Sequence, residues 1–227
     1  MTTLENSFLK LKSTKVIDAI IDYKNYIPLN LNVSNTELAK IDIKSAAEFE
    51  IYIEDLFQKK EAKVAYGGYN EKRYLYNQNG HFNNQQAKER NIHIGLDLWI
   101  KAGTAVIAPL DGTIHSFKNN LGTGDYGPTI ILKHELDGMF FHTLYGHLST
   151  ESLQDIKIGD LVKQGSTIAT LGDATVNGGY SPHLHFQIIK NIANYYGDYP
   201  GVCSADDLNY YLENCPDPNL LLKIERD

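Results

Sequence analysis

The sequence predicts a mainly β protein with an N-terminal helical segment, which is an α+β organisation. From residue 93 to about residue 189, glycines separate short runs rich in β-branched residues, such as TAVIA, PTIILKH and HLHFQII. Turn signals such as Asp111-Gly112 and Asp137-Gly138 recur between these runs, which is typical of an all-β sandwich or barrel. Residues 1–60 differ, because their apolar residues recur at helical spacing.

The N-terminal segment, residues 1–60, is expected to be mostly helical. Ser45 stands where it can cap a helix. The apolar residues expected along one face of that helix are Phe49, Tyr52, Ile53 and Phe57. An earlier helix is expected from the spacing of Val16, Ile17, Ile20 and Ile21.

Three further segments follow. Residues 61–92 are rich in Gly, Asn, Gln and Tyr, and we expect a loop with short extended pieces. Its polar run from Asn77 to Arg90 is a candidate flap over a site. Residues 93–189 are expected to form the β core. Residues 190–227 are expected to be a C-terminal extension that packs on this core.

Bulk composition excludes several classes of protein. The 227 residues include 42% hydrophobic and 22% charged residues, as in ordinary globular proteins. The net charge is −7 and no basic block is present, so nucleic acid is not an expected partner. No apolar run is long enough to span a membrane. No signal peptide is seen, so a cytoplasmic location is expected, or a periplasmic or extracellular one if a signal has been removed.

Histidines carry the chemistry of the sequence. In the run HLHFQI, alternation along a strand places His183, His185 and Gln187 on one face. In HIGLD, an extended backbone places His93 and Asp97 on one face, and Gly95 between them leaves room for an ion. His147 ends another expected strand. Each of the first two elements alone is as compatible with surface histidines as with a site, and a lone histidine at a strand end is usually structural.

Together these elements indicate a catalytic metal site. Two neutral imidazoles and a carboxylate are a three-ligand set for zinc that leaves a fourth position open. Zinc acidifies bound water and polarises carbonyl groups, which suits hydrolysis of an amide bond. Two further histidines could then move protons or stabilise an oxyanion.

The segments HIGLD, LYGHL and SPHLHFQI, in this order, resemble the M23 family of zinc metallopeptidases, the lysostaphin or LytM type. The resemblance implies an antiparallel two-sheet β-sandwich. It also implies His93, Asp97 and His185 as ligands of Zn²⁺, with His147 and His183 as catalytic residues. The substrate would be a peptide or a peptidoglycan fragment.

A second, fainter resemblance rests on GGYNEKR, PGV and CPDPNLLL. These segments look like the M23-like domain of multidomain proteins that also carry aminotransferase domains. Two alternatives to a cell-wall peptidase therefore stay open. One is an intracellular amidohydrolase with a small soluble substrate, and the other is a non-catalytic binding module that contains a metal. The oligomeric state is not indicated.

The other histidines and the cysteines fall outside these motifs. We expect structural or solvent-facing roles for the remaining histidines, which are His81, His115, His134 and His142. Asn70 is a candidate for lining the groove. Cys203 and Cys215 could pair, but two cysteines do not make a disulfide framework.

Overall fold

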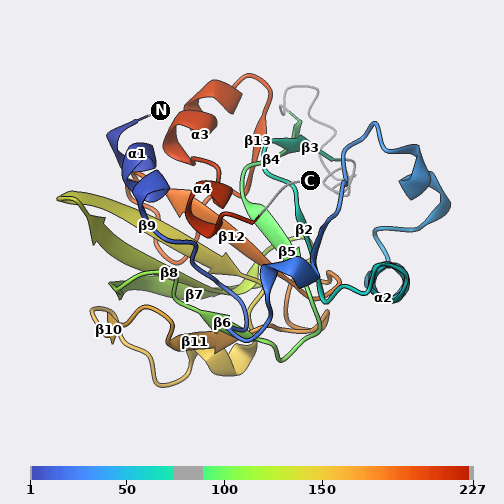
Figure 1. The fold of residues 1–227 in the computed structure, drawn as a ribbon, viewed down its shortest axis with the longest axis horizontal. Helices are drawn as coiled ribbons and strands as arrows, with labels where there is room; N and C mark the ends of the chain where they lie inside the picture. The colour runs from blue at the N-terminus through green and yellow to red at the C-terminus, as the bar shows by residue number, and fades with distance from the viewer. Residues whose placement is uncertain (1, 74–88, 225–227) are drawn as a thin grey trace.

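The computed structural model describes residues 2–73 and 89–224, and these form three β-sheets and a few helices (Figure 1). The strands are β1 (Tyr26–Pro28), β2 (Val64–Gly67), β3 (Glu71–Lys72), β4 (Arg90–His93), β5 (Leu96–Trp99), β6 (Ala105–Ile107), β7 (Gly112–Asn120), β8 (Gly127–Leu136), β9 (Met139–Gly146), β10 (Leu161–Val162), β11 (Thr167–Thr170), β12 (His183–Ile189) and β13 (Val202–Ser204). The α-helices are α1 (Thr3–Lys10), α2 (Ala46–Lys60), α3 (Leu208–Asn214) and α4 (Asn219–Leu222). Short 3-10 helices cover Tyr23–Asn25, Thr36–Lys40 and Thr150–Leu153.

The largest sheet has eight strands in the order β1-β2-β5-β12-β9-β8-β7-β10. All its neighbouring pairs are antiparallel except β1 with β2. A three-stranded sheet has the order β13-β4-β3, and β11 pairs with β6. The prediction of a mainly β protein is confirmed. These sheets do not clearly reproduce the two-sheet sandwich that the resemblance implies, so that detail stays a prediction.

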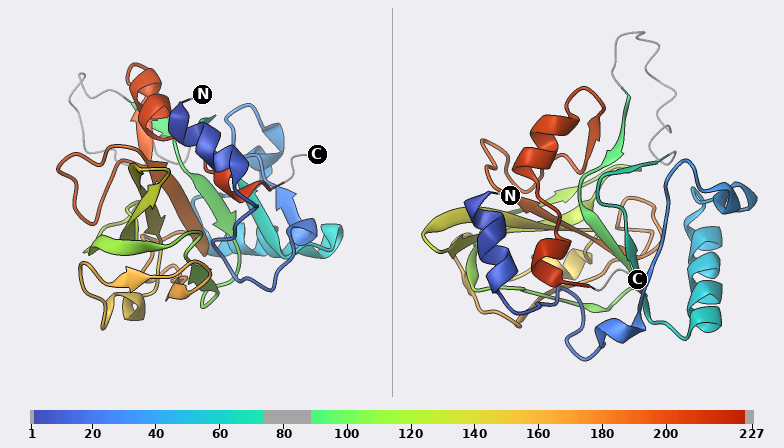
Figure 2. Two further views of the ribbon diagram at one scale, coloured as in Figure 1. Left: turned by 60° about the vertical axis from the view of Figure 1, so that its left-hand side comes forward. Right: turned by 45° about the horizontal axis from the view of Figure 1, so that its top comes forward.

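The main core lies against one face of the large sheet. From β12, the side chains of Leu184, Phe186 and Ile188 are fully buried in it, as the alternation of HLHFQI predicts. Helices α1 and α4, near the two ends of the chain, both pack on this core. There α1 lies beside α4, as both views of Figure 2 show.

The N-terminal segment is only partly helical. Helix α2 begins as predicted, because the Ser45 side chain accepts a hydrogen bond from the Glu48 N–H. Phe49 and Ile53 bury one side of α2 against a cluster that includes Trp99. Helix α2 stands at the other side of the molecule from α1 (Figure 2).

The expected helix around residues 16–21 is wrong. Val16 and Ile17 are buried, and Ile17 forms a β-bridge with Val106, whereas Ile20 is 91% exposed. β-branched side chains suit such an extended, half-buried position, and pairing with a distant strand decided the local conformation. No helix in residues 2–73 and 89–224 has the length and apolar character needed to cross a membrane.

Candidate metal centre

His93 and Asp97 come from strands of two different sheets. His93 ends β4, where it pairs with Val202 and Glu71, and Asp97 lies in β5 opposite His185. The chain therefore bends between the two strands, where a single extended segment was expected. Gly95 stands at this bend, and a Cβ atom there would lie 2.4 Å from Cε1 of His185. Gly95 thus makes room for an imidazole, and the ion-sized space predicted from the sequence is taken by that ring.

The β12 strand supplies His183 and His185 from one face, as predicted. Opposite His185 on the other side is Gly146, the last residue of β9. His147 follows with a φ of 62°, a left-handed conformation that is uncommon outside glycine. This conformation turns the side chain of His147 toward β12, and the ring centroids of His147 and His183 lie 4.1 Å apart.

Hydrogen bonds fix which nitrogen of His93 and of His185, the two candidate ligand histidines, carries a proton. Nδ1 of His93 lies 2.8 Å from the Gly68 carbonyl oxygen, which can only accept, so Nδ1 is the protonated atom. The amide nitrogen of Gln187 donates to the carbonyl of Pro200. The amide oxygen of Gln187 therefore faces Nε2 of His185, at 2.9 Å, and accepts its proton. The remaining lone pairs are on Nε2 of His93 and Nδ1 of His185.

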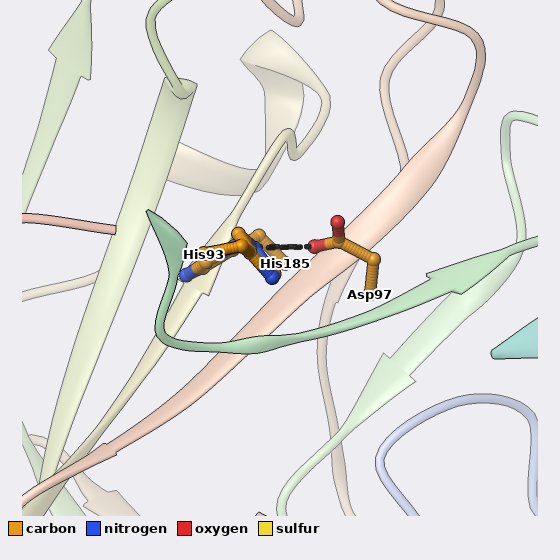
Figure 3. A group of neighbouring side chains, drawn as sticks. All are labelled: His93, Asp97 and His185. Atoms are coloured by element: carbon orange, nitrogen blue, oxygen red, sulfur yellow. Dashed lines mark hydrogen bonds and ion pairs between the residues drawn. The ribbon is translucent and has the colours of Figure 1, made fainter. Parts of the chain in front are cut away.

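These two lone pairs face each other and a carboxylate. Figure 3 shows the three side chains, with a dashed line that leads to Asp97. Nε2 of His93 lies 2.9 Å from Nδ1 of His185. Oδ1 of Asp97 lies 3.3 Å and 3.2 Å from these two atoms. All three side chains are 2% exposed. Three facing lone pairs without a proton between them repel one another, and a shared cation removes that repulsion. The donor set therefore fits a metal ion, and one atom from each residue is in reach.

The pKa shifts agree with a neutral His93 imidazole and an ionised Asp97 carboxylate. Burial, followed by the charge of Arg73, lowers the pKa of His93 to about 4. Burial alone would raise the pKa of Asp97, but the guanidinium charge of Arg73 beside it helps to hold that pKa well below its ordinary value. Metal ligands must be deprotonated, so these directions favour binding at neutral pH.

The two predicted catalytic histidines are held in the same way. Nδ1 of His147 lies 2.7 Å from the Asn177 carbonyl oxygen, and Nδ1 of His183 lies 2.8 Å from that of Ser181. Both rings therefore keep a lone pair on Nε2. Burial lowers the pKa of both histidines, which favours their neutral form at neutral pH. Nε2 of His183 is 4.0 Å from Oδ1 of Asp97, which places it beside the ligand atoms.

The five residues line one groove of about 410 Å³. Side chains from far along the chain line the same groove. From the N-terminal segment these are Ile43, Ala46 and Phe49, and from the C-terminal region Tyr195, Tyr199 and Pro200. The groove is therefore lined by segments that precede the β core in the sequence and by segments that follow it.

Histidines outside the motifs lie elsewhere, and His81 falls outside the described residues. His134 is buried between the Asp111 carbonyl and Thr143 Oγ1. The rings of His115 and His142 contact each other, with centroids 4.8 Å apart. Asn70 is exposed in the turn before β3 and does not line the groove described here. Cys203 and Cys215 are both buried with free thiols.

Two residues of the site were not predicted. Gln187 was placed on the histidine face of β12, but no local pattern indicated that its amide holds His185. Arg73 is the last residue of the segment GGYNEKR. Its Nη1 donates a hydrogen bond to Oδ2 of Asp97, at 2.6 Å. The charged side chain of Arg73 is only 2% exposed, which composition and spacing do not reveal.

Comparisons with known proteins find sequence similarity over the region that holds the histidines of the groove. The sequence model for "Peptidase family M23" matches residues 91–196. An uncharacterised metalloprotease of Haemophilus influenzae is 40% identical over 99 residues, which are 44% of this chain and 19% of that protein. The peptidoglycan DD-endopeptidase ShyC of Vibrio cholerae is 33% identical over 99 residues, 44% of this chain and 20% of that protein. The matched region thus spans about a fifth of these relatives.

Among solved structures, the catalytic domain of lysostaphin from Staphylococcus simulans is 28% identical, with a TM-score of 0.37. The matched region covers 53% of this chain and 80% of the lysostaphin domain. None of these matches supports the second resemblance, to proteins with aminotransferase domains. The ordered motifs and the matching family model agree on one assignment: residues 91–196 form a peptidase family M23 domain.

Proposed function

We propose that this chain is a zinc-dependent metalloendopeptidase, with peptides of peptidoglycan as its substrate. The observation that carries the proposal is the convergence of three lone pairs on buried His93, Asp97 and His185. Imidazole nitrogen and a single carboxylate favour zinc over the harder cations Mg²⁺ and Ca²⁺, which prefer oxygen ligands. The M23 domain and the substrate named for the Vibrio cholerae relative support the reaction and the substrate.

In this proposal, His93, Asp97 and His185 hold the ion. When bound, zinc supplies a Lewis acid that polarises the scissile carbonyl and lowers the pKa of water. His147 and His183 then act as the catalytic pair. One of the two accepts the proton of the attacking water on its Nε2 and returns that proton to the leaving amine. The other, when it carries a proton on Nε2, stabilises the tetrahedral oxyanion.

Walls of the groove support an extended peptide as the substrate. The groove extends past the two catalytic histidines to apolar Ile43 and Phe49 and to aromatic Tyr195 and Tyr199. Pockets lined by apolar and aromatic side chains with few convergent polar groups are typical binding sites. A groove lined by residues well beyond the three candidate ligands suits a peptide that extends past the cleaved bond.

The test is hydrolysis of purified peptidoglycan fragments by the zinc-loaded protein, followed by mass spectrometry of the products. Cleavage at an amide bond that stops with a chelator and returns with zinc is the expected result. An unrelated peptide of similar length is the control substrate. Cleavage of small peptides alone would keep the hydrolase and reject the cell-wall substrate. No cleavage of any fragment by zinc-loaded protein would contradict the enzymatic proposal and favour a metal-containing binding module.

A further inference from the structure

Arg73 contacts the metal centre from outside the matched family region of residues 91–196. Its Nη1 donates to Oδ2 of Asp97 at 2.6 Å, while Oδ1 of the same carboxylate faces His93 and His185. The two carboxylate oxygens of Asp97 therefore have different partners. One oxygen is held by the guanidinium and the other is left for the ion.

Glu71 holds Arg73 in turn. Nε of Arg73 donates to Oε2 of Glu71 at 2.6 Å, and Oε1 of Glu71 accepts from the Leu31 N–H at 2.9 Å. Glu71 is 9% exposed and Arg73 2%. A continuous line of hydrogen bonds therefore runs from the backbone of the N-terminal segment, through two buried charges, to a metal ligand.

The absence of a side chain at Gly68 leaves space for these hydrogen-bonded side chains. A Cβ atom at Gly68 would lie 1.8 Å from Nη2 of Arg73 and 2.9 Å from Nδ1 of His93. Gly68 also has a φ of 100°, a conformation that other residues rarely adopt. The same glycine thus admits Arg73 and offers its carbonyl to His93.

We propose that Arg73 is a positioning residue of the metal centre, and that Glu71 holds it in place. Arg73 fixes the rotation of the Asp97 carboxylate, so that Asp97 offers the ion Oδ1 alone. The inference rests on the metal site of the proposed function and adds the N-terminal segment to it. Residues 31, 71 and 73 then belong to the functional unit, although they lie outside the matched domain.

Physical considerations favour a positioning role over a stabilising one. Burying an ion network costs desolvation that its attraction often fails to recover, so such a network is weak support for stability. Partners that orient a metal ligand commonly change metal affinity by about 10–100-fold. A guanidinium is suited to this task because its planar fork bonds two carboxylates at once.

The test is a charge-balanced double variant, Arg73→Met with Glu71→Gln. It removes one positive and one negative charge, so the net charge around the site is unchanged. The dissociation constant for Zn²⁺ is measured by competition with a chromophoric chelator, beside the thermal midpoint of the metal-free protein. We expect zinc binding to weaken about 10–100-fold while the metal-free midpoint stays close to that of the wild type.

Two further variants sharpen the result. In Arg73→Lys, one N–H donor can still reach Asp97, and binding is expected to recover part of the loss. Arg90→Met is the matched control, since Arg90 lines the same groove but donates only to the Val202 carbonyl in the bonds seen here. This variant is expected to bind zinc like the wild type.

The outcomes separate the two proposals. If the wild type binds zinc tightly and the folded double variant binds it equally well, the positioning role is overturned and the metal site stands. If the wild type itself does not bind zinc, the proposed function fails and the inference fails with it. A loss of zinc affinity in Arg90→Met as large as in the double variant would also overturn the inference.

Discussion

Two groups of histidines lie on or beside the same eight-stranded sheet, and their surroundings differ. One group is His183, His185 and the adjoining His147, and the other is His115, His134 and His142 on β7, β8 and β9. In the first group, one ring N–H of each histidine faces a carbonyl oxygen, which for His185 is that of the Gln187 amide. The other ring nitrogens of His183 and His185 lie 4.0 Å and 3.2 Å from Oδ1 of Asp97. In the second, His134 bonds with both ring nitrogens, and Lys133 stands near the other two.

The difference shows that the number of buried histidines does not define a metal site. Both groups are at least partly buried, and burial lowers the pKa of His134 and His142 as it does those of His147 and His183. What distinguishes the first group is a nearby carboxylate and lone pairs left pointing inward. The second group has no carboxylate among its described ring contacts. The positive charge of Lys133 near His115 and His142 would also repel a metal cation.

The largest expected effect concerns metal content. His185→Ala removes one of three ligands, and the protein should lose its zinc. His142→Ala, the matched change in the other group, should keep the wild-type content. Elemental analysis of both purified variants measures this. Equal zinc in the two variants would mean that the comparison has identified the wrong group.

Turnover separates the proton-carrying histidines from the ligands. His147→Ala and His183→Ala should retain zinc but lose activity by roughly 10²–10⁴-fold, because each removes an acid–base group. The control is His115→Ala, with kcat and zinc content measured on the same substrate. Full activity in His183→Ala would show that its predicted role is wrong.

A smaller effect is expected at Gln187, whose amide fixes the protonated nitrogen of His185. Gln187→Leu leaves Nε2 of His185 without this acceptor, and zinc affinity should fall about 10–100-fold. Gln164→Leu is the matched control, because the Gln164 amide likewise donates to a proline carbonyl, that of Pro109, far from the groove. Unchanged zinc affinity in Gln187→Leu would mean that this amide does not orient the ligand.

The smallest effect is on stability in acid. Burial, helped by His115 and Lys133, lowers the pKa of His142 to about 4, whereas a histidine in an unfolded chain titrates near 6.5. Between these values the unfolded state binds more protons, so stability falls as the pH drops from about 6.5 toward 4 and is unaffected above 6.5. Thermal midpoints of metal-free wild type and His142→Gln should therefore converge as the pH falls. Parallel curves would contradict this.

The local parts of the site were predictable from the sequence. Alternation along HLHFQI depends only on the strand period, so His183 and His185 were placed correctly on one face, and Leu184 and Phe186 in the core. The cap of α2 at Ser45 is equally local. The roles of the five predicted site residues stay predictions, although the structure brings these residues together in one groove.

Other features depend on contacts between distant segments. Ile17 joined a β-bridge with Val106 where its spacing predicted a helix. Arg73 meets Asp97 only because β2 pairs with β5 and the following turn returns the chain to the site. The bend at Gly95 follows from β4 and β5 belonging to different sheets. None of these contacts has a signature within a few residues of sequence.

The most direct test of the metal centre is competition between cations in the wild-type protein. The protein is stripped with a chelator, dialysed against equal concentrations of Zn²⁺, Mg²⁺ and Ca²⁺, and its bound metals are quantified. Two imidazoles and one carboxylate predict retention of about one zinc per chain and little of the other two. Retention of no zinc, or of Mg²⁺ or Ca²⁺ in its place, would contradict the metal centre described here.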